Sequence, residues 1–319
     1  KKVLWLIIYL DKDIPANIQS NLILLKVTGN KILNLFGWLR FLLSNLPKII
    51  KGFDFFLVNI SSFNLFANKL TSSIEDGLIK NCNEIIIPYE GQPFQNKMIK
   101  SLKEKNNNLL ITGYIHSPPL AVPTNFIYKQ FSPDRIFLSG KDQIFCFNKI
   151  LGWPKKKLNF IPSLRFRKNI PQTNKKILIP YTVKKHDHIL SMIEYIHQKK
   201  TNLNGYKIQN HPAAKNSKSN LKLISNIQNI ISSKTWSKKK LYDFIFIGNS
   251  GGISEFLERG FKILHICEDP EFERYSSKIW KSIKTTEISK HIFSYKLKKS
   301  GNLIKFGKNG ADLNLILDY

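Results

Sequence analysis

The sequence predicts an α/β protein with two Rossmann-like domains whose parallel sheets face a central cleft. Three observations lead to this prediction. A chain of 319 residues exceeds the length of one ordinary domain, so two domains of about 150 residues are expected. Short apolar runs alternate with amphipathic segments, a pattern typical of parallel strands joined by helical crossovers. The alternation occurs twice, on either side of a segment with several Gly and Pro residues at 152–174, which we interpret as a linker.

The first series of elements begins with a buried strand at residues 3–10. Further strands are expected at 53–60, 84–88, 109–115 and 135–138, and helices at 64–80, 95–105 and 142–151. The segment 31–51 carries apolar residues at helical spacing with basic residues and no acid, and it breaks near Pro47. Two interpretations of this segment remain open: a helix packed on the first sheet, or a basic helix bearing Trp38 and Phe41 on a membrane surface.

The second series predicts strands at 175–180, 205–212, 243–248 and 261–267, and helical segments at 186–200, 219–232 and 252–260. Gly260 is expected to cap the last of these helices. In open α/β sheets, ligands bind beyond the carboxyl ends of the strands. The first candidates for a functional site are therefore residues that follow strands: Glu90, His116, His211 and Ser250.

Composition excludes several classes of protein. The many Ile, Leu and Phe residues exclude full disorder. Three distant cysteines without a CxxC pair exclude a disulfide scaffold and suit a reducing compartment. The apolar runs are too short to predict a transmembrane helix, and the N-terminal VLWLIIYL lacks a small-residue cleavage site, so it is expected to be a strand rather than a signal peptide.

The net charge of +28 favours polyanionic partners, although part of the lysine excess also suits an ordinary solvated surface. No acid occurs between Asp142 and Asp187 or between Glu194 and Asp243, so the basic residues concentrate in the middle of the chain. Nucleic-acid-binding motifs are absent from the sequence, and no nucleic acid partner is expected.

Two motifs of the second series suit an anionic ligand. His211 can donate a hydrogen bond to a phosphate or carboxylate, and Pro212 fixes the turn that aims it. The Gly248–Gly252 loop, with Asn249, Ser250 and Gly251, lets the backbone approach a ligand at the start of a predicted helix. Both motifs are also compatible with ordinary tight turns.

Two motifs of the first series suit catalysis. Glu90 can act as a general base, or it is a solvated loop acid. The pair Glu75 and Asp76 ranks lower because it falls in or beside a predicted helix. His116 precedes Ser117 and two prolines that hold a loop at the cleft rim, where it could contact a phosphate or an acceptor hydroxyl. No HExxH motif or other metal-ligand spacing is present, so no metal is expected.

Together these motifs resemble the GT-B glycosyltransferases that use CMP-activated acidic sugars, of the bacterial sialyl-, polysialyl- and Kdo-transferase type, and a group of surface-carbohydrate biosynthesis proteins. The resemblance spans roughly residues 84–268. It rests on YEGQPF, GYIHS, LGWP, IPSLR, HP and NSG, at 89–94, 113–117, 151–154, 161–165, 211–212 and 249–251. It implies a GT-B fold, with residues 1–160 as the N-terminal acceptor domain and 161–319 as the C-terminal donor domain.

The resemblance also implies roles for individual residues. His211 would contact the CMP phosphate, and Ser250 with Asn249 and the Gly251 N–H would hold the phosphate or the sugar carboxylate. Glu90 would be the base, with His116 beside the acceptor. Glu255, one turn into the following helix, could hold the ribose hydroxyls. Two departures stand out: Tyr89 replaces the first acid of the acidic motif, and Gly251 replaces a second hydroxyl after Ser250.

The function implied is transfer of a sialic-acid-like or Kdo-like sugar to a surface glycan or glycolipid, in capsule or lipopolysaccharide assembly. The CMP-sugar is a co-substrate, and no cofactor is expected. The partners would be the nucleotide sugar, a glycan or lipid-linked acceptor and an anionic membrane surface. The location would be cytoplasmic or peripheral on the inner face of the cytoplasmic membrane. Two alternatives remain: a UDP-sugar epimerase-like GT-B enzyme, and a non-enzymatic polyanion-binding protein.

Overall fold

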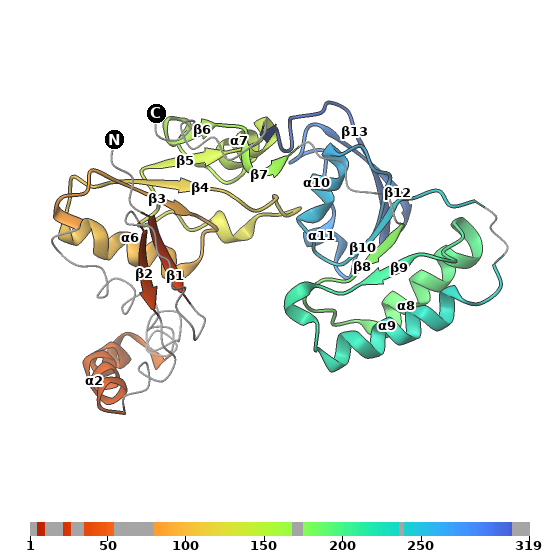
Figure 1. Ribbon diagram of the computed structural model, residues 1–319, viewed down its shortest axis with the longest axis horizontal. Coiled ribbons are helices and arrows are strands. Elements are labelled where there is room, and N and C mark those ends of the chain that lie inside the picture. Colours follow the sequence, from red (N-terminus) through yellow and green to blue (C-terminus); the bar gives the residue numbers. More distant parts are fainter. Residues whose placement is uncertain are drawn as a thin grey trace. The chain divides into compact units, whose positions relative to one another are not determined.

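The computed structural model describes residues 5–9, 22–26, 35–53, 79–167, 175–235 and 239–307 (Figure 1). Helices and parallel strands alternate in it, which confirms the predicted α/β class. The chain forms two compact units, the first made of residues 1–112 and 129–134 and the second of residues 113–128 and 135–319. The boundary predicted between residues 160 and 161 stays a prediction. No helix in the described ranges is both long and apolar enough to cross a lipid bilayer.

The N-terminal part of the first unit contains a two-stranded parallel sheet and a helix. Strand β1 (Trp5–Tyr9) confirms the first predicted strand, and its partner β2 (Leu22–Lys26) is a strand that the sequence pattern did not predict. Helix α2 (Leu35–Asn45) is followed by the 3-10 helix η1 (Leu46–Lys51), so the predicted break near Pro47 is confirmed. Residues 54–78, with most of the strand and helix predicted there and with Glu75 and Asp76, lie outside the described residues.

Four strands form a sheet in the order β3-β4-β5-β6, and β5 pairs with β6 in parallel. These strands are β3 (Glu84–Pro88), β4 (Leu110–Tyr114), β5 (Arg135–Leu138) and β6 (Leu158–Phe160). Helix α6 (Pro93–Lys105) and helix α7 (Lys141–Phe145) with the π-turn η3 (Cys146–Ile150) confirm the helices predicted at 95–105 and 142–151. The first precedes β4, and the second precedes β6, which the pattern did not predict. Short 3-10 turns occupy η2 (Thr124–Phe126) and η4 (Lys155–Lys157).

The linker prediction for 152–174 is wrong for the residues described there. Strand β6 lies within it, and β7 (Ser163–Arg167) pairs in parallel with β14 (Phe306–Gly307). The indole of Trp153 is fully buried and donates to the Phe126 carbonyl at 2.9 Å. This segment is therefore packed structure, although its strands are too short to show a periodic pattern.

The second unit is built on a six-stranded sheet in the order β12-β13-β11-β10-β8-β9. Strands β8 to β11 pair in parallel, whereas β12 and β13 pair in antiparallel with each other, as β13 does with β11. The expectation of a purely parallel sheet is therefore wrong at this edge. The strands are β8 (Lys176–Leu178), β9 (Lys207–Gln209), β10 (Phe244–Ile247), β11 (Ile263–Ile266), β12 (Ile283–Ser289) and β13 (Ile292–Leu297).

Helices cover both faces of this sheet. On one face, Ile245 and Ile247 of β10 share a core with α8 and α9, which lie side by side in Figure 1. On the other face, Phe244 and Phe246 pack with α10. Burial on both faces explains why β10 reads as an uninterrupted apolar run. The helices are α8 (His186–Tyr195) with its π-turn η5 (Ile196–Lys200), α9 (Lys218–Ile231), α10 (Gly252–Glu258) and α11 (Pro270–Glu273).

The order of strands reverses direction next to β8. The chain passes from β8 to β9 on one side and returns to β10 and then β11 on the other. Such a switch point opens a crevice at the carboxyl ends of the two central strands, where α/β proteins bind ligands. The loops after β8 and β10, at residues 179–185 and 248–251, border this point.

Candidate functional site

The turn after β9 presents the imidazole of His211 to solvent. Its Nδ1 accepts the backbone N–H of Ala213 at 3.2 Å, which caps the 3-10 turn η6 (Pro212–Ala214). A nitrogen that accepts a hydrogen bond carries no proton, so the neutral ring holds its proton on Nε2. Pro212 occupies the first position of the turn, where the missing N–H costs nothing. The turn therefore directs Nε2–H outward as a hydrogen-bond donor.

A cavity of about 560 Å³ lies beside this turn, within the range of ligand pockets. The ring of Tyr181 meets that of His211 edge-on, with centroids 5.9 Å apart. Buried Asn220 joins the two walls by donating from Nδ2 to the Pro180 carbonyl at 3.1 Å and to Asn210 Oδ1 at 2.9 Å. The lining comprises residues of the loop after β8, of η6 and the residues that follow it, and of the start of α9: Tyr181, Thr182, Val183, Pro212, Ala213, Ala214, Lys215, Asn216, Ser217, Ser219 and Asn220.

The glycine loop after β10 lies against the loop after β8. Gly248 has φ +61°, a conformation that favours glycine, and a Cβ placed on it would lie 3.3 Å from Pro180 Cγ. Asn249 is exposed and Ser250 is half-buried. Helix α10 begins at Gly252, directly after Gly251, and has only seven residues. The predicted β-turn-helix is therefore present, with a shorter helix than 252–260.

The structure brings the predicted loop of His116 to the loop of Ser250, within the second unit. A Cβ on Gly251 would lie 2.6 Å from the Pro118 carbonyl oxygen. The buried hydroxyl of Tyr275 has the Pro119 carbonyl oxygen at 2.6 Å and the Ser250 carbonyl oxygen at 3.0 Å, so its proton joins the two loops. Sequence reasoning missed Tyr275, because nothing in its neighbourhood of the chain marks it as a bridge. His116 itself is half-buried at the end of β4.

Two acids gather next to Gly248, and sequence reasoning missed both. Glu268 is the second residue after β11, and its Oε1 accepts the backbone N–H groups of Lys184 and Lys185 at 2.7 and 2.6 Å. Glu273 Oε2 accepts the N–H of Glu268 at 2.7 Å. A Cβ on Gly248 would lie 3.7 Å from Glu268 Oε2 and 4.0 Å from Glu273 Oε1. The strand-end rule that selected Ser250 would also have selected Glu268.

Burial is the largest cause that raises the pKa of Glu273, to about 7, and the side chains of Glu268 and Asp269 act in the same direction. Hydrogen bonds from the backbone of Glu268 and Asp269 oppose this shift. The carboxyl group is therefore close to half-ionised near neutral pH.

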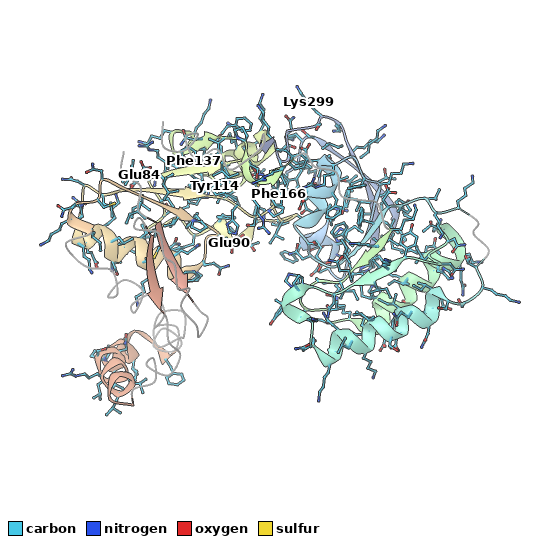
Figure 2. The ribbon with its side chains drawn as sticks, in the orientation of Figure 1. Glu84, Glu90, Tyr114, Phe137, Phe166 and Lys299 are labelled. Carbon is cyan, nitrogen blue, oxygen red and sulfur yellow. The ribbon has the colours of Figure 1, made fainter. Side chains whose placement is uncertain are left out.

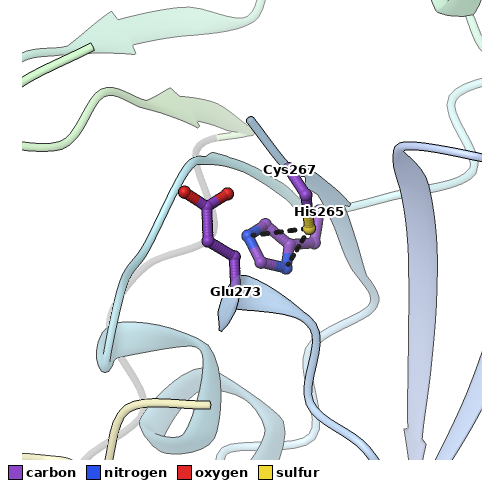
Figure 3. Close-up of side chains that lie close together, drawn as sticks. All are labelled: His265, Cys267 and Glu273. Atoms are coloured by element: carbon purple, nitrogen blue, oxygen red, sulfur yellow. Dashed lines mark hydrogen bonds between the residues drawn. The ribbon is translucent and has the colours of Figure 1, made fainter. Parts of the chain in front are cut away.

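Glu273 also belongs to a buried cluster with His265 and Cys267 (Figure 3). Their nearest ligand atoms lie within 4.8 Å of one another, which raises the question of a metal ion. Both ring nitrogens of His265 are already engaged, Nε2 with the Gly248 carbonyl at 2.7 Å and Nδ1 with the Tyr295 hydroxyl at 2.8 Å. A metal would have to displace one of these bonds. We therefore interpret the cluster as a buried polar network that holds the glycine loop through the hydrogen bond between His265 and the Gly248 carbonyl.

A pair of histidines lies close to the same strand end. The rings of His188 and His291 meet edge-on with centroids 4.4 Å apart, and His291 Nδ1 bonds the Cys267 carbonyl at 3.0 Å. Burial first, and then the charges of His291 and Lys185, lower the pKa of His188, whereas Glu268 acts in the opposite direction. This pair is a further feature that the sequence did not reveal.

Glu255, expected to hold ribose hydroxyls, is paired with a cation. Its Oε1 accepts from Arg259 Nη2 at 2.9 Å and Nε at 3.0 Å, one helical turn further on. The sequence offers this i,i+4 pair as a simple alternative to ligand binding. The predicted role of Glu255 stays a prediction.

Glu90 lies in the first unit, in a hydrogen-bonded turn after β3 (Figure 2). Gln95 holds this turn: its Oε1 accepts the N–H groups of Glu90 at 2.9 Å and Gln92 at 3.1 Å, and its Nε2 donates to the Pro88 carbonyl at 2.7 Å. Tyr89, which occupies the place of a second acid, is fully buried and donates to Asn96 Oδ1 at 2.8 Å. The structure thus gives Glu90 a fixed backbone and Tyr89 a packing role.

Of the predicted site residues, the structure places His211, Pro212, Asn249, Ser250 and Gly251 on the carboxyl edge of one sheet, with the loop of His116 against Ser250 and Gly251. Glu90 belongs to the other unit. The chain matches no protein-family model and no curated protein.

Proposed function

We propose that the chain is a glycosyltransferase that transfers an acidic sugar, sialic-acid-like or Kdo-like, from a CMP-activated donor to a surface glycan or glycolipid. The proposal includes a GT-B arrangement of two Rossmann-like domains, a cytoplasmic location and independence from metal ions. The observation that carries it is His211, an exposed donor in the turn after β9 whose next residues, Pro212 to Ala214, line a cavity of ligand size.

The chemistry requires a group that stabilises the departing nucleotide. When the bond between the sugar and the CMP phosphate breaks, negative charge grows on the phosphate oxygen. A hydrogen bond from His211 Nε2 to that oxygen would strengthen as the charge develops. Two further donors belong to the same unit. Lys215 lies on the cavity wall, and Ser250 lies in the glycine loop after β10.

The acceptor hydroxyl must lose its proton as it attacks the sugar. We assign this proton to Glu90, because its turn is held by Gln95 and its side chain is only half-buried. In the complete reaction, the acceptor oxygen bonds the anomeric carbon, the bond to CMP breaks, CMP leaves, and Glu90 carries the proton away.

A nucleotide thermal-shift panel tests the proposal. The wild-type chain is heated with CMP, CDP, UDP or GDP at equal concentrations. A ligand that binds only the folded state raises the melting temperature. Stabilisation by CMP above the other three supports the CMP-sugar donor, and CMP release from a CMP-sugar in the presence of acceptor supports transfer. Equal effects of all four would indicate general anion binding, as for a polyanion-binding protein.

One set of contacts favours a second candidate, a sugar-nucleotide epimerase-like enzyme. Such an enzyme needs clustered acids and histidines in both domains, and in the second unit Glu268, Glu273, His188 and His291 gather at the end of β11. The pKa of Glu273, raised to about 7 chiefly by burial, suits proton transfer near neutral pH. Stabilisation by UDP above CMP, together with loss of UDP-sugar turnover in Glu273→Gln, would favour this candidate over a CMP-sugar transferase.

A further inference from the structure

Helix α2 and the 3-10 helix η1 carry large apolar side chains on the outside. Of the side chains described between residues 39 and 53, only that of Asn45 is buried, at 5% exposure. An ordinary packed helix turns its apolar side inward, whereas six of the large apolar side chains described in this range are exposed. The exposed apolar residues, which we call the α2 patch, are Leu39, Leu43, Leu46, Ile49, Ile50 and Phe53.

The spacing places the first of these residues on one face. Leu39, Leu43 and Leu46 follow one another at intervals of four and three residues, which is one face of an α-helix. Ile49 follows Leu46 at an interval of three, the repeat of the 3-10 helix, while Ile50 lies in the same helix and Phe53 follows just beyond its end. The side chain of Ile50 is 89% exposed and that of Leu43 55%. Single exposed apolar residues are common on proteins, but a patch of six in fifteen residues is a mark of an interaction surface.

The charges around the α2 patch identify its partner. No acidic residue occurs from Ile14 to Phe53, whereas Lys26, Lys31, Arg40, Lys48 and Lys51 are basic. Arg40 is exposed in the same helix. Cations thus alternate with the apolar residues along the sequence, and the next acid is Asp54, after the last residue of the patch. An apolar segment with interspersed cations suits the boundary of an anionic bilayer, where acyl chains accept the Leu and Ile side chains and headgroups attract the cations. A second copy of this chain would bring the same cations together and repel.

We infer that the α2 patch binds the chain peripherally to anionic lipid bilayers. The apolar side chains enter the headgroup boundary, and each nearby Lys or Arg strengthens binding to an anionic surface by about fivefold. Attachment of this kind requires no bilayer-spanning helix. The inference does not depend on the proposed glycosyl transfer, because it rests on exposed side chains and charge alone.

The test is co-sedimentation of the full chain with vesicles of phosphatidylcholine alone or mixed with phosphatidylglycerol. A net charge of +28 attracts any anionic vesicle, so the decisive variant must leave the charge unchanged. Leu43→Ser with Ile50→Ser removes two apolar side chains of the α2 patch at constant charge. Its matched control is Leu221→Ser, which removes an apolar residue that is 49% exposed on α9 in the second unit. Far-ultraviolet circular dichroism and thermal melting confirm that each variant folds.

We expect wild type and Leu221→Ser to sediment with the anionic vesicles. The double variant should bind them more weakly, by a factor of about ten or more. Arg40→Gln should weaken binding to anionic vesicles by about fivefold, and this loss should disappear in high salt. Equal binding by wild type and the double variant would assign attachment to general charge and overturn the inference. If wild type binds neither the neutral nor the anionic vesicles, the inference is also overturned. A wild-type dimer that the double variant converts to a monomer would assign the α2 patch to a second copy of the chain.

Discussion

Replacement of Glu273 by Gln offers a quantitative test of the buried network beneath the glycine loop. The folded structure raises the pKa of this carboxyl from 4.5 to about 7, chiefly through burial. The folded protein therefore holds a proton that the unfolded chain releases between pH 4.5 and 7. Stability from this group is fully present below pH 4.5 and is lost as the pH rises through 7. A displacement of this size corresponds to about 3 kcal/mol.

Glutamine keeps an oxygen to accept the N–H of Glu268 but never ionises. The free energy of unfolding of Glu273→Gln should therefore match that of wild type at pH 4.5 and exceed it by up to about 3 kcal/mol above pH 7. His265 acts in the opposite direction, because burial lowers its pKa from 6.5 to about 4, so its stabilisation is lost as the pH falls through this range. The difference between variant and wild type cancels this second effect, since both chains contain His265.

Urea unfolding at pH values from 4.5 to 8.5 measures this difference. Glu271→Gln is the matched control, because Glu271 is exposed on the same short helix, α11. Its effect should stay within about 0.5 kcal/mol at every pH. A pH-independent difference for Glu273→Gln would refute the raised pKa. A variant less stable than wild type at pH 8 would show that the ionised carboxyl has a favourable partner, such as a metal ion held with His265 and Cys267.

Three further predictions concern other parts of the fold and the reaction. Glu90→Gln should lower the rate of sugar transfer about 100-fold or more with little change in CMP affinity, whereas Glu104→Gln, in an exposed ion pair, should change neither. Gly251→Ala should destabilise the protein by about 1–3 kcal/mol in thermal unfolding, because its Cβ would clash with a backbone carbonyl at 2.6 Å. Glu258→Ala should cost about 3 kcal/mol or more in urea unfolding, because its buried carboxyl accepts one hydroxyl and three backbone N–H groups at 300–304. A loss below about 1 kcal/mol for Glu258→Ala would contradict these contacts.

The sequence predicted best those strands that are buried on both faces. β10 is a continuous apolar run and β11 an apolar run with one histidine, each followed by a loop, and such a run needs no knowledge of distant residues to be recognised. β12 was missed because it is polar: of its seven residues only Ile283 is buried, and the rest face solvent or are half-covered. Pairing with β13 decides that this segment is a strand, and pairing is not visible in a local pattern.

The candidate site was predictable where it depends on local turn chemistry. A histidine before proline and a serine among glycines mark loops at strand ends, and both lie there. Glu268 and Glu273 were not predictable as buried groups, because CEDPEFERY resembles a solvated acidic loop. Their burial depends on other segments: two N–H donors to Glu268 come from residues more than eighty positions earlier in the chain. The contact of the His116 loop with Ser250 likewise depends on Tyr275, about 25 residues beyond Ser250.

Nearby charges indicate which of the two proposed phosphate ligands, His211 or Ser250, contributes more to CMP binding. His211 stands beside a cavity whose lining contains Lys215 and no acid. The loop of Ser250 instead begins at Gly248, next to Glu268 and Glu273. Acids next to the start of this loop disfavour a phosphate anion there and suit a hydroxyl group. His211→Ala should therefore weaken CMP binding by about 10- to 150-fold, the loss of one hydrogen bond to a charged group, whereas Ser250→Ala should weaken it less.

His211→Asn is the control for damage to the turn. The asparagine side-chain oxygen can still accept the Ala213 N–H, so a loss of CMP binding in this variant reports the missing imidazole donor rather than a damaged turn. Isothermal titration with CMP measures all three variants, and a larger loss for Ser250→Ala than for His211→Ala would place the phosphate at the glycine loop despite the acids.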